Sequence, residues 1–167
     1  MSITRKPNGW YWDTQGPFQT RTEALSVGAA MGAPVMREDD ASDAQRMGVF
    51  VATMLQSAEV AHVLHFRVTG PGSRSAHLAL QTYYEAIPDL VDTLTESIMG
   101  LTLTLIPVAK PFRFGVMEND PLDYIQSLQN YVRDQRETLP SNSEIQNEVD
   151  NIATLLNSTA YQLFFLK

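Results

Sequence analysis

All three histidines of the chain, His62, His65 and His77, lie within a stretch of sixteen residues. A Gly-Pro-Gly sequence at residues 70–72 separates the first two from the third, and a turn there would join two antiparallel helices. His65 and His77 would then lie at the same level, where two neutral imidazoles suit one transition metal ion. The alternative interpretation is that these side chains lie at a helical corner and are satisfied by backbone groups or water.

Two carboxylates farther along, Asp92 and Glu96, are four residues apart and share a helix face, a spacing that can present both to one cation. A solvated acidic face has the same pattern. His77 and Asp92 are fifteen residues apart, about 22 Å along a helix, whereas metal–ligand bonds are roughly 2.0–2.6 Å. The two pairs therefore cannot share an ion within one chain. They could share one across a two-fold axis, if this helix packed antiparallel against its copy in a second chain.

The other motifs in the sequence do not indicate a specific catalytic or binding site. Glu59 and His62 fit the Glu-x-x-His pair of di-iron helix bundles, but such sites need a second pair, and no histidine follows His77. We therefore interpret Glu59 as a surface or interface charge. The chain has neither a Gly-x-Gly-x-x-Gly sequence nor a Walker loop, and nothing in it points to a Ser-His-Asp hydrolase.

Four amphipathic helices must position these residues. Apolar residues recur at helical spacing over residues 41–68, and a second helix is expected from Ser73, as its N-cap, to about Met99, with Pro88 inside it and Gly100 ending it. A third helix should open at Asp120 and Pro121 and stop before Pro140. The fourth should begin at a capping box formed by Ser141 and Glu144. The predicted apolar stripes of the last two helices are Ile125, Leu128, Val132 and Leu139, and Ile145, Val149, Ile152, Leu156 and Leu163.

The connections suggest a topology. The first and last helix pairs have short links and should be antiparallel neighbours, whereas about 20 residues, 101–119, form a long irregular connection between the second and third helices. One long crossover is typical of a ferritin-like all-α four-helix bundle. Before it, the aromatic residues 9–19, with a turn at Gly16-Pro17, predict a β-hairpin followed by a short helix. We expect residues 1–36 to form this appendage and linker, and residues 37–167 the bundle.

Composition limits the function further. Twelve basic and nineteen acidic residues leave a net charge of -7, which disfavours binding to nucleic acid or to anionic membranes. The absence of cysteine excludes disulfides, thiolate metal sites and cysteine nucleophiles. The N-terminus lacks the apolar core of a signal peptide, and no uninterrupted apolar stretch of about 18 residues predicts a membrane span. We expect a protein that stays in the cytoplasm of a bacterial or phage-infected cell, with a virion as the alternative location.

Residues 62–98 resemble the Dps mini-ferritins, the iron-oxidising proteins of starved bacteria. That family has His-x-x-His-Trp, a Gly-Pro corner, a histidine twelve residues after the second one, an aspartate four residues later, and an aspartate and a glutamate fifteen and nineteen residues after that histidine. The resemblance implies that His65 and His77 are metal ligands and that Asp92 and Glu96 come from the neighbouring subunit. It also implies iron (Fe2+/Fe3+) as the metal, with other divalent ions as alternatives, and a homo-oligomer, a dodecamer in that family, with two-fold interfaces along the second helix.

Two departures from the family pattern affect the activity. Gln81 stands where the family has its first aspartate, so it and His62 are at most weak or indirect ligands, and ferroxidase activity would be reduced or lost. Phe66 replaces the tryptophan, and no basic tail supports DNA binding. Gln81 and the appendage resemble uncharacterised tailed-phage relatives of the fold. The competing hypothesis is a non-catalytic structural or interaction protein, with a degenerate site and a protein partner for the hairpin around Trp10 and Trp12.

Overall fold

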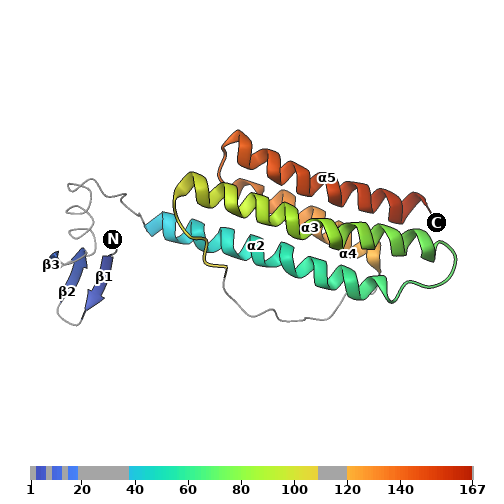
Figure 1. The fold of residues 1–167 in the computed structure, drawn as a ribbon, viewed down its shortest axis with the longest axis horizontal. Coiled ribbons are helices and arrows are strands. Elements are labelled where there is room, and N and C mark those ends of the chain that lie inside the picture. The colour runs from blue at the N-terminus through green and yellow to red at the C-terminus, as the bar shows by residue number, and fades with distance from the viewer. Residues whose placement is uncertain (1–2, 7–8, 13–14, 19–37, 109–119, 167) are drawn as a thin grey trace. The chain divides into compact units, whose positions relative to one another are not determined.

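The computed structural model describes residues 3–6, 9–12, 15–18, 38–108 and 120–166 (Figure 1). By its internal contacts the chain divides into two compact units, Met1–Ser42 and Asp43–Lys167. The described part of the first unit consists of a three-stranded antiparallel sheet in the order β1-β2-β3 and the first residues of the helix that begins at Glu38. The regular elements of the second unit's described part are all helices. The appendage helix expected after the hairpin lies outside the described residues.

The sheet consists of β1 (Ile3–Lys6), β2 (Gly9–Trp12) and β3 (Gln15–Phe18). Ile3 pairs with Trp12 and Lys6 with Gly9 across β1 and β2. Between β2 and β3, Trp12 pairs with Gln15, and the register shifts between Trp10 and Trp12. Gly16 and Pro17, expected in a turn, lie within β3. A proline is tolerated there because β3 is an edge strand, where a residue needs no ladder donor on its outer side.

The helices of the second unit lie side by side as a bundle (Figure 1). They are α2 (Glu38–His65), α3 (Ser73–Thr102), α4 (Pro121–Gln135), continued by a short 3-10 helix (Arg136–Thr138), and α5 (Ser143–Phe165). The starts of α3 and α4 and the end of α5 line one cleft, together with Arg67, just after the end of α2. Helices α3 and α4 therefore run parallel to each other, and α2 and α5 run in the opposite direction.

Helix boundaries follow the predictions in part. Asp120 caps α4 as predicted: its Oδ1 accepts hydrogen bonds from the backbone N–H groups of Leu122, at 2.8 Å, and Asp123, at 3.2 Å. Ser73 is not the N-cap of α3, because Gly72 takes that position with φ 74°. The capping box at Ser141 is also absent, since Asn142 is the N-cap of α5 and makes no side-chain capping bond.

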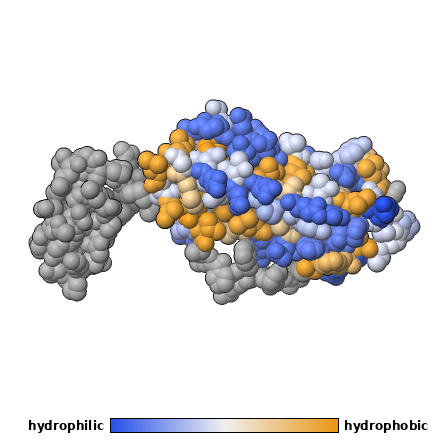
Figure 2. All heavy atoms as spheres, in the orientation of Figure 1, coloured by the Kyte–Doolittle hydropathy of each residue, from blue (hydrophilic) through white to orange (hydrophobic). Residues whose placement is uncertain are grey.

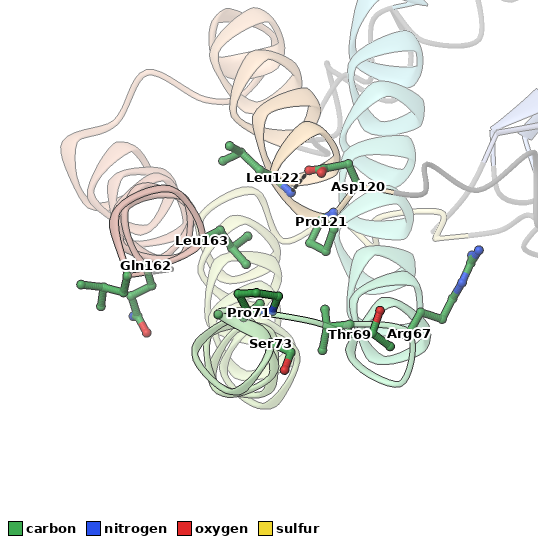
Figure 3. Close-up of a pocket in the computed structure, with 13 residues that line it drawn as sticks. Arg67, Thr69, Pro71, Ser73, Asp120, Pro121, Leu122, Gln162 and Leu163 are labelled. Carbon is green, nitrogen blue, oxygen red and sulfur yellow. Dashed lines mark hydrogen bonds between the residues drawn. The ribbon is translucent and has the colours of Figure 1, made fainter.

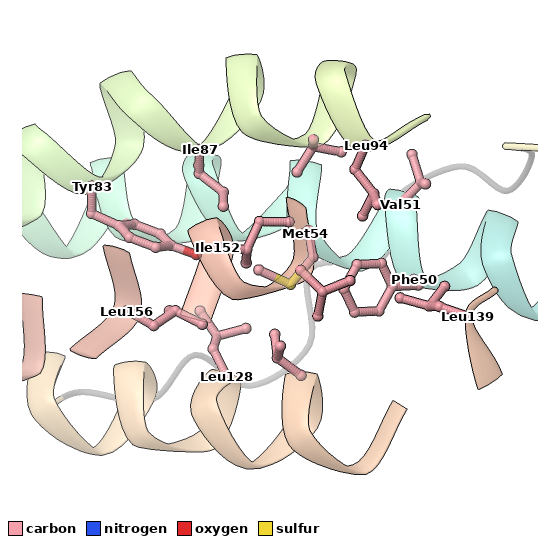
Figure 4. Packing of buried hydrophobic residues seen from close by; sticks show 14 of the residues in the cluster. Phe50, Val51, Met54, Tyr83, Ile87, Leu94, Leu128, Leu139, Ile152 and Leu156 are labelled. Carbon is pink, nitrogen blue, oxygen red and sulfur yellow. The ribbon is translucent and has the colours of Figure 1, made fainter. Parts of the chain in front are cut away.

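The buried core confirms the predicted apolar stripes (Figure 4). The predicted core side chains of α4 and α5 are all at most 6% exposed, as are Phe50, Met54 and Leu64 of α2. One stretch of the described residues, Asp43–His65, is long and apolar enough to cross a membrane by length and composition alone. Its burial against the other helices accounts for that composition equally well.

Gly48 lets the connection after α3 approach α2 closely. A Cβ atom at residue 48 would lie 2.5 Å from the carbonyl oxygen of Pro107. Ile106, the neighbour of that proline, is 6% exposed and belongs to the core. The α3–α4 connection is therefore packed on the bundle at Ile106 and Pro107.

Candidate metal-binding site

The corner between α2 and α3 brings His65 and His77 together, as the sequence predicts. Gly70 and Gly72 have φ values of 82° and 74°, which glycine adopts without strain, so the chain can reverse within a few residues. His65 is buried and His77 is exposed. The ring centroids of the two side chains are 3.6 Å apart with 27° between the planes.

One hydrogen bond defines which nitrogen of His65 is available. Its Nδ1 lies 3.0 Å from the backbone carbonyl oxygen of His77. A carbonyl can only accept, so Nδ1 carries the proton, and the neutral ring has its lone pair on Nε2. Histidines that bind metals are commonly held in this way, through a hydrogen bond from the second ring nitrogen. His65 is therefore prepared to act as a ligand through Nε2.

The two stacked rings do not yet form a chelating pair. A metal ion lies in the plane of an imidazole that binds it, at about 2.0–2.1 Å from the nitrogen. The two rings overlap face to face, with centroids 3.6 Å apart and only 27° between their planes. Their in-plane lone pairs therefore do not point at one shared position, and one ring must turn before both can bind one ion. His77 is the freer of the two, because it is exposed.

Aromatic side chains surround His65 on its other sides. Tyr84 lies edge-on to it at 5.3 Å and 90°, and Phe66 at 5.3 Å and 73°. His62 stacks on Tyr84, with ring centroids 4.2 Å apart, and lies edge-on to His65 at 5.9 Å. Edge-to-face contacts of this kind are favourable and orient a ring. From the sequence, Tyr84 is interpreted as a packing residue without a role in the site, although it follows His77 by seven residues, two helical turns on one face. Phe66 is likewise given no role.

Gln81 faces a carboxylate in the same helix. Its Nε2 donates a hydrogen bond of 2.8 Å to Oε1 of Glu85, one turn later. An aspartate at residue 81 would instead place two carboxylates four residues apart, which repel each other. The amide thus serves as a donor to Glu85 in the described conformation.

Asp92 and Glu96 are exposed on α3, far along the helix from His77. Among the described residues no group of three or more histidine or acidic side chains is placed to hold a metal ion. Ion pairs among the described residues include Arg46–Asp43, Arg133–Asp134 and Arg136–Asp150, which lie outside α3. One chain therefore supplies the imidazoles and the carboxylates at separate places.

A cleft of about 400 Å³ lies at the corner end of the bundle (Figure 3). Its lining includes Thr69 and Ser73 of the corner, Asp120 and Gln162, mixed with apolar side chains such as Leu163. None of the predicted ligands lines it. The carboxylate of Asp120 is occupied by capping α4, so the cleft does not extend the candidate metal site.

A family model matches residues 72–163, more than half of the chain, and spans α3, α4 and most of α5. The chain belongs to a family of unknown function, DUF5856. The DUF5856 region contains His77, Asp92 and Glu96, whereas His62 and His65 precede it on α2. No curated protein and no solved structure matches the chain. The function of this DUF5856 member must therefore be argued from its own residues.

Proposed function

We propose that the protein is a ferritin-like bundle that binds divalent metal, with iron as the expected ion, at sites shared between two copies of the chain. His65 and His77 of one copy and Asp92 and Glu96 of the other are the ligands. The observation that supports this most strongly is the pairing of the two imidazoles, with Nδ1 of His65 held by the carbonyl oxygen of His77 and Nε2 left to bind.

The topology supports the ferritin-like assignment. The parallel direction of α3 and α4, with antiparallel pairs on either side, requires one long connection between two helical hairpins. Bundles with one such crossover are the ferritin-like kind. The sheet of β1, β2 and β3 fits the proposed N-terminal appendage, whose helix is not among the described residues.

The geometry also supports a shared site. The imidazoles of one chain lie about 22 Å along α3 from its own carboxylates, and the described residues form no complete metal site. If α3 packs antiparallel on its copy about a point between residues 85 and 86, His77 lies level with the middle of the partner's Asp92–Glu96 pair. The two-fold axis then produces two equal sites.

Two variants test the sharing directly. His65→Ala/His77→Ala and Asp92→Asn/Glu96→Gln should each abolish binding of Fe(II), titrated without oxygen, or of Zn(II), in isothermal calorimetry. A mixed dimer of the two variants has one site without any ligands and one intact site, so mixing should restore up to half of the sites. Wild-type protein that binds neither metal, or single variants that bind normally, would contradict the metal site. Binding that never returns on mixing would contradict the sharing.

Oxidation of Fe(II) and storage of the product form the further part of this proposal. They require two irons close together and a closed shell, and Gln81 removes one carboxylate that the resemblance implies for the site. We therefore expect slow oxidation at most. Absorbance in the near ultraviolet after addition of Fe(II) in air measures it, and the histidine variant is the control.

The second candidate is a structural or interaction protein without metal chemistry. The observation that favours it is the set of exposed apolar side chains at the end of α5, where Tyr161, Phe164 and Phe165 are 53–65% exposed. Exposed patches of this kind are typical of interaction surfaces. A protein that binds no metal in the titrations above, yet retains its assembly in both double variants, would agree with this candidate.

A further inference from the structure

Leu103 combines backbone strain with exposure. It ends α3 with φ 50° and ψ 32°, and it is the one residue other than glycine with a positive φ in the described part of the chain. Glycine is the residue that suits this conformation at the end of a helix. Leu103 is also 90% exposed, next to Leu101 at 44% and Leu105 at 82%. We call Leu101, Leu103 and Leu105 the leucine ridge.

Apolar surface is visible near both ends of the helical unit in Figure 2, one of them the end where α3 finishes. The ridge lies at that end. Strained residues are concentrated at functional sites, and exposed apolar patches are typical of interaction sites. An exposed apolar surface with a strained residue at its centre is therefore a candidate contact site.

The charges of α3 indicate what lies against this helix. Arg74 is in its first turn, where no acidic residue lies, and the acidic residues follow later, with no basic residue in the last turn. This order opposes the helix dipole, which favours acidic groups at the start and basic groups at the end. A second α3 in the opposite direction relieves the conflict, because its acidic half lies beside Arg74. Charge complementarity between Arg74 and the partner's acidic half therefore favours a second copy of this chain.

The antiparallel register of the proposed shared site also determines which residues lie opposite the leucine ridge. When His77 is level with position 94 of the partner, Arg74 is level with position 97, beside the partner's Glu96. The same register places position 98 of the partner level with Ser73, so the last turn of the partner's α3 and its ridge extend past the start of α3, at the end where the α2–α3 corner lies. We propose that the leucine ridge of one copy docks on the α2–α3 corner, residues 68–71, of a second copy. This inference rests on the antiparallel α3 pair of the proposed function.

The corner offers suitable surface for the contact. Pro71 and Thr69 are exposed, and Val68 is half-buried and packs against the core. By symmetry a dimer has two such contacts, one at each end of the α3 pair, outside the two metal sites. The ridge thus extends the interface with apolar area that the acidic middle of α3 lacks.

The absence of cysteine makes a cross-linking test direct. Thr69 and Leu103 are separated within one chain by the 30 residues of α3, about 45 Å, whereas a disulfide needs Cα atoms within about 7 Å. Thr69→Cys/Leu103→Cys should therefore form only intermolecular disulfides. We expect a covalent dimer on mild oxidation in EDTA, at least about tenfold faster than for Thr69→Cys/Ser141→Cys. Ser141 is exposed and beyond the far end of α4, so this control measures random collisions.

A second pair of variants tests the apolar contact without cross-linking. Leu103→Gly/Leu105→Ser should raise the dimer Kd in sedimentation velocity at least about tenfold. Phe165→Ser, which alters a side chain 65% exposed on α5, should leave that Kd unchanged. Circular dichroism checks that both variants fold. Equal cross-linking in the control, or an unchanged Kd in the leucine variant, would overturn the proposal.

The two proposals fail in different ways. A cross-linked dimer in EDTA together with a null metal titration retains the docking surface and removes the metal site. Metal binding that returns on mixing the two ligand variants, together with no cross-link above the control, retains the shared site and removes the docking of the ridge.

Discussion

The hydroxyl oxygens of Ser57 on α2 and Tyr83 on α3 are 2.6 Å apart in the core, where both residues are completely buried. Ser57 also bonds the backbone carbonyl oxygen of Met54 at 2.6 Å. A carbonyl only accepts, so the single proton of Ser57 goes to Met54 and Tyr83 must be the donor to Ser57. In this pair Tyr83 is therefore the donor, and Ser57 is the acceptor that also donates to Met54.

Removing the acceptor should cost more stability than removing the donor. Ser57→Ala leaves the hydroxyl of Tyr83 buried without a partner, which should lower the free energy of unfolding by about 1–3 kcal/mol. Tyr83→Phe leaves Ser57 bonded to Met54 and should cost about 1 kcal/mol. Urea unfolding of both single variants and the double variant measures the difference. Additive effects, or a larger cost for Tyr83→Phe, would contradict this arrangement.

Alkaline pH should destabilise the bundle through two tyrosines. Burial raises the pKa of Tyr83 and of Tyr124 well above the usual 10.0. Above pH 10 the unfolded chain loses these protons while the folded chain keeps them. The free energy of unfolding is therefore unaffected by these groups below that pH and falls above it, by up to about 1.4 kcal/mol per pH unit for each tyrosine.

Tyr83→Phe/Tyr124→Phe is the variant that isolates this effect. Its free energy of unfolding should fall less steeply between pH 10 and 12 than that of the wild type, with other groups titrating equally in both. Denaturant titrations over this pH range measure the slopes, and equal slopes would show that the tyrosines do not contribute.

Gly48 and Gly100 form a matched pair for substitution. Gly48→Ala should destabilise the protein by about 1–3 kcal/mol through overpacking, since its Cβ would lie 2.5 Å from a backbone oxygen that cannot move freely. Gly100→Ala meets no atom within 4 Å and should stabilise α3 by about 0.5–1 kcal/mol. Thermal unfolding compares the two. A stabilising Gly48→Ala would contradict the close contact with Pro107.

Gln81→Asp should raise the affinity for metal and lower the free energy of unfolding of the metal-free protein. The new carboxylate, one turn after His77, should raise the affinity for a hard divalent ion such as Mn(II) by about tenfold if the site binds as proposed. The apo protein should become slightly less stable, because the donor to Glu85 is replaced by a like charge. Calorimetry and urea unfolding measure the two effects, with Gln81→Asn as the uncharged control. No gain in affinity would place residue 81 outside the site.

The periodicity of apolar residues predicted the helices of the bundle well, and local conformation limited the accuracy at their ends. Ile125, Leu128 and Val132 are buried as expected, and Asp120 and Pro121 open α4. Gly100 does not end α3, because a glycine in a helix costs only about 1 kcal/mol while the next turn can continue to Thr102. The prediction that Ser73 is the N-cap of α3 was wrong, because the residue at that position has a positive φ, which Gly72 adopts without strain.

The location of the candidate site could be predicted from the sequence, whereas the orientation of its side chains could not. Residue spacing alone predicts that His65 and His77 lie at one level across the corner, and the centroids of their rings are 3.6 Å apart. Spacing does not determine how rings are oriented, so the stacking, the hydrogen bond to a backbone carbonyl and the contact with Tyr84 required coordinates. The partner's contribution through Asp92 and Glu96 stays a prediction.

The parallel direction of α3 and α4 divides the folding of the bundle into local and distant steps. Helices α2 and α3 can pair through a corner of a few residues, and so can α4 and α5. Bringing the two hairpins together instead requires closure of a much longer loop, whose entropy grows slowly with its length. Insertions between residues 108 and 120 should therefore slow folding more than they lower equilibrium stability.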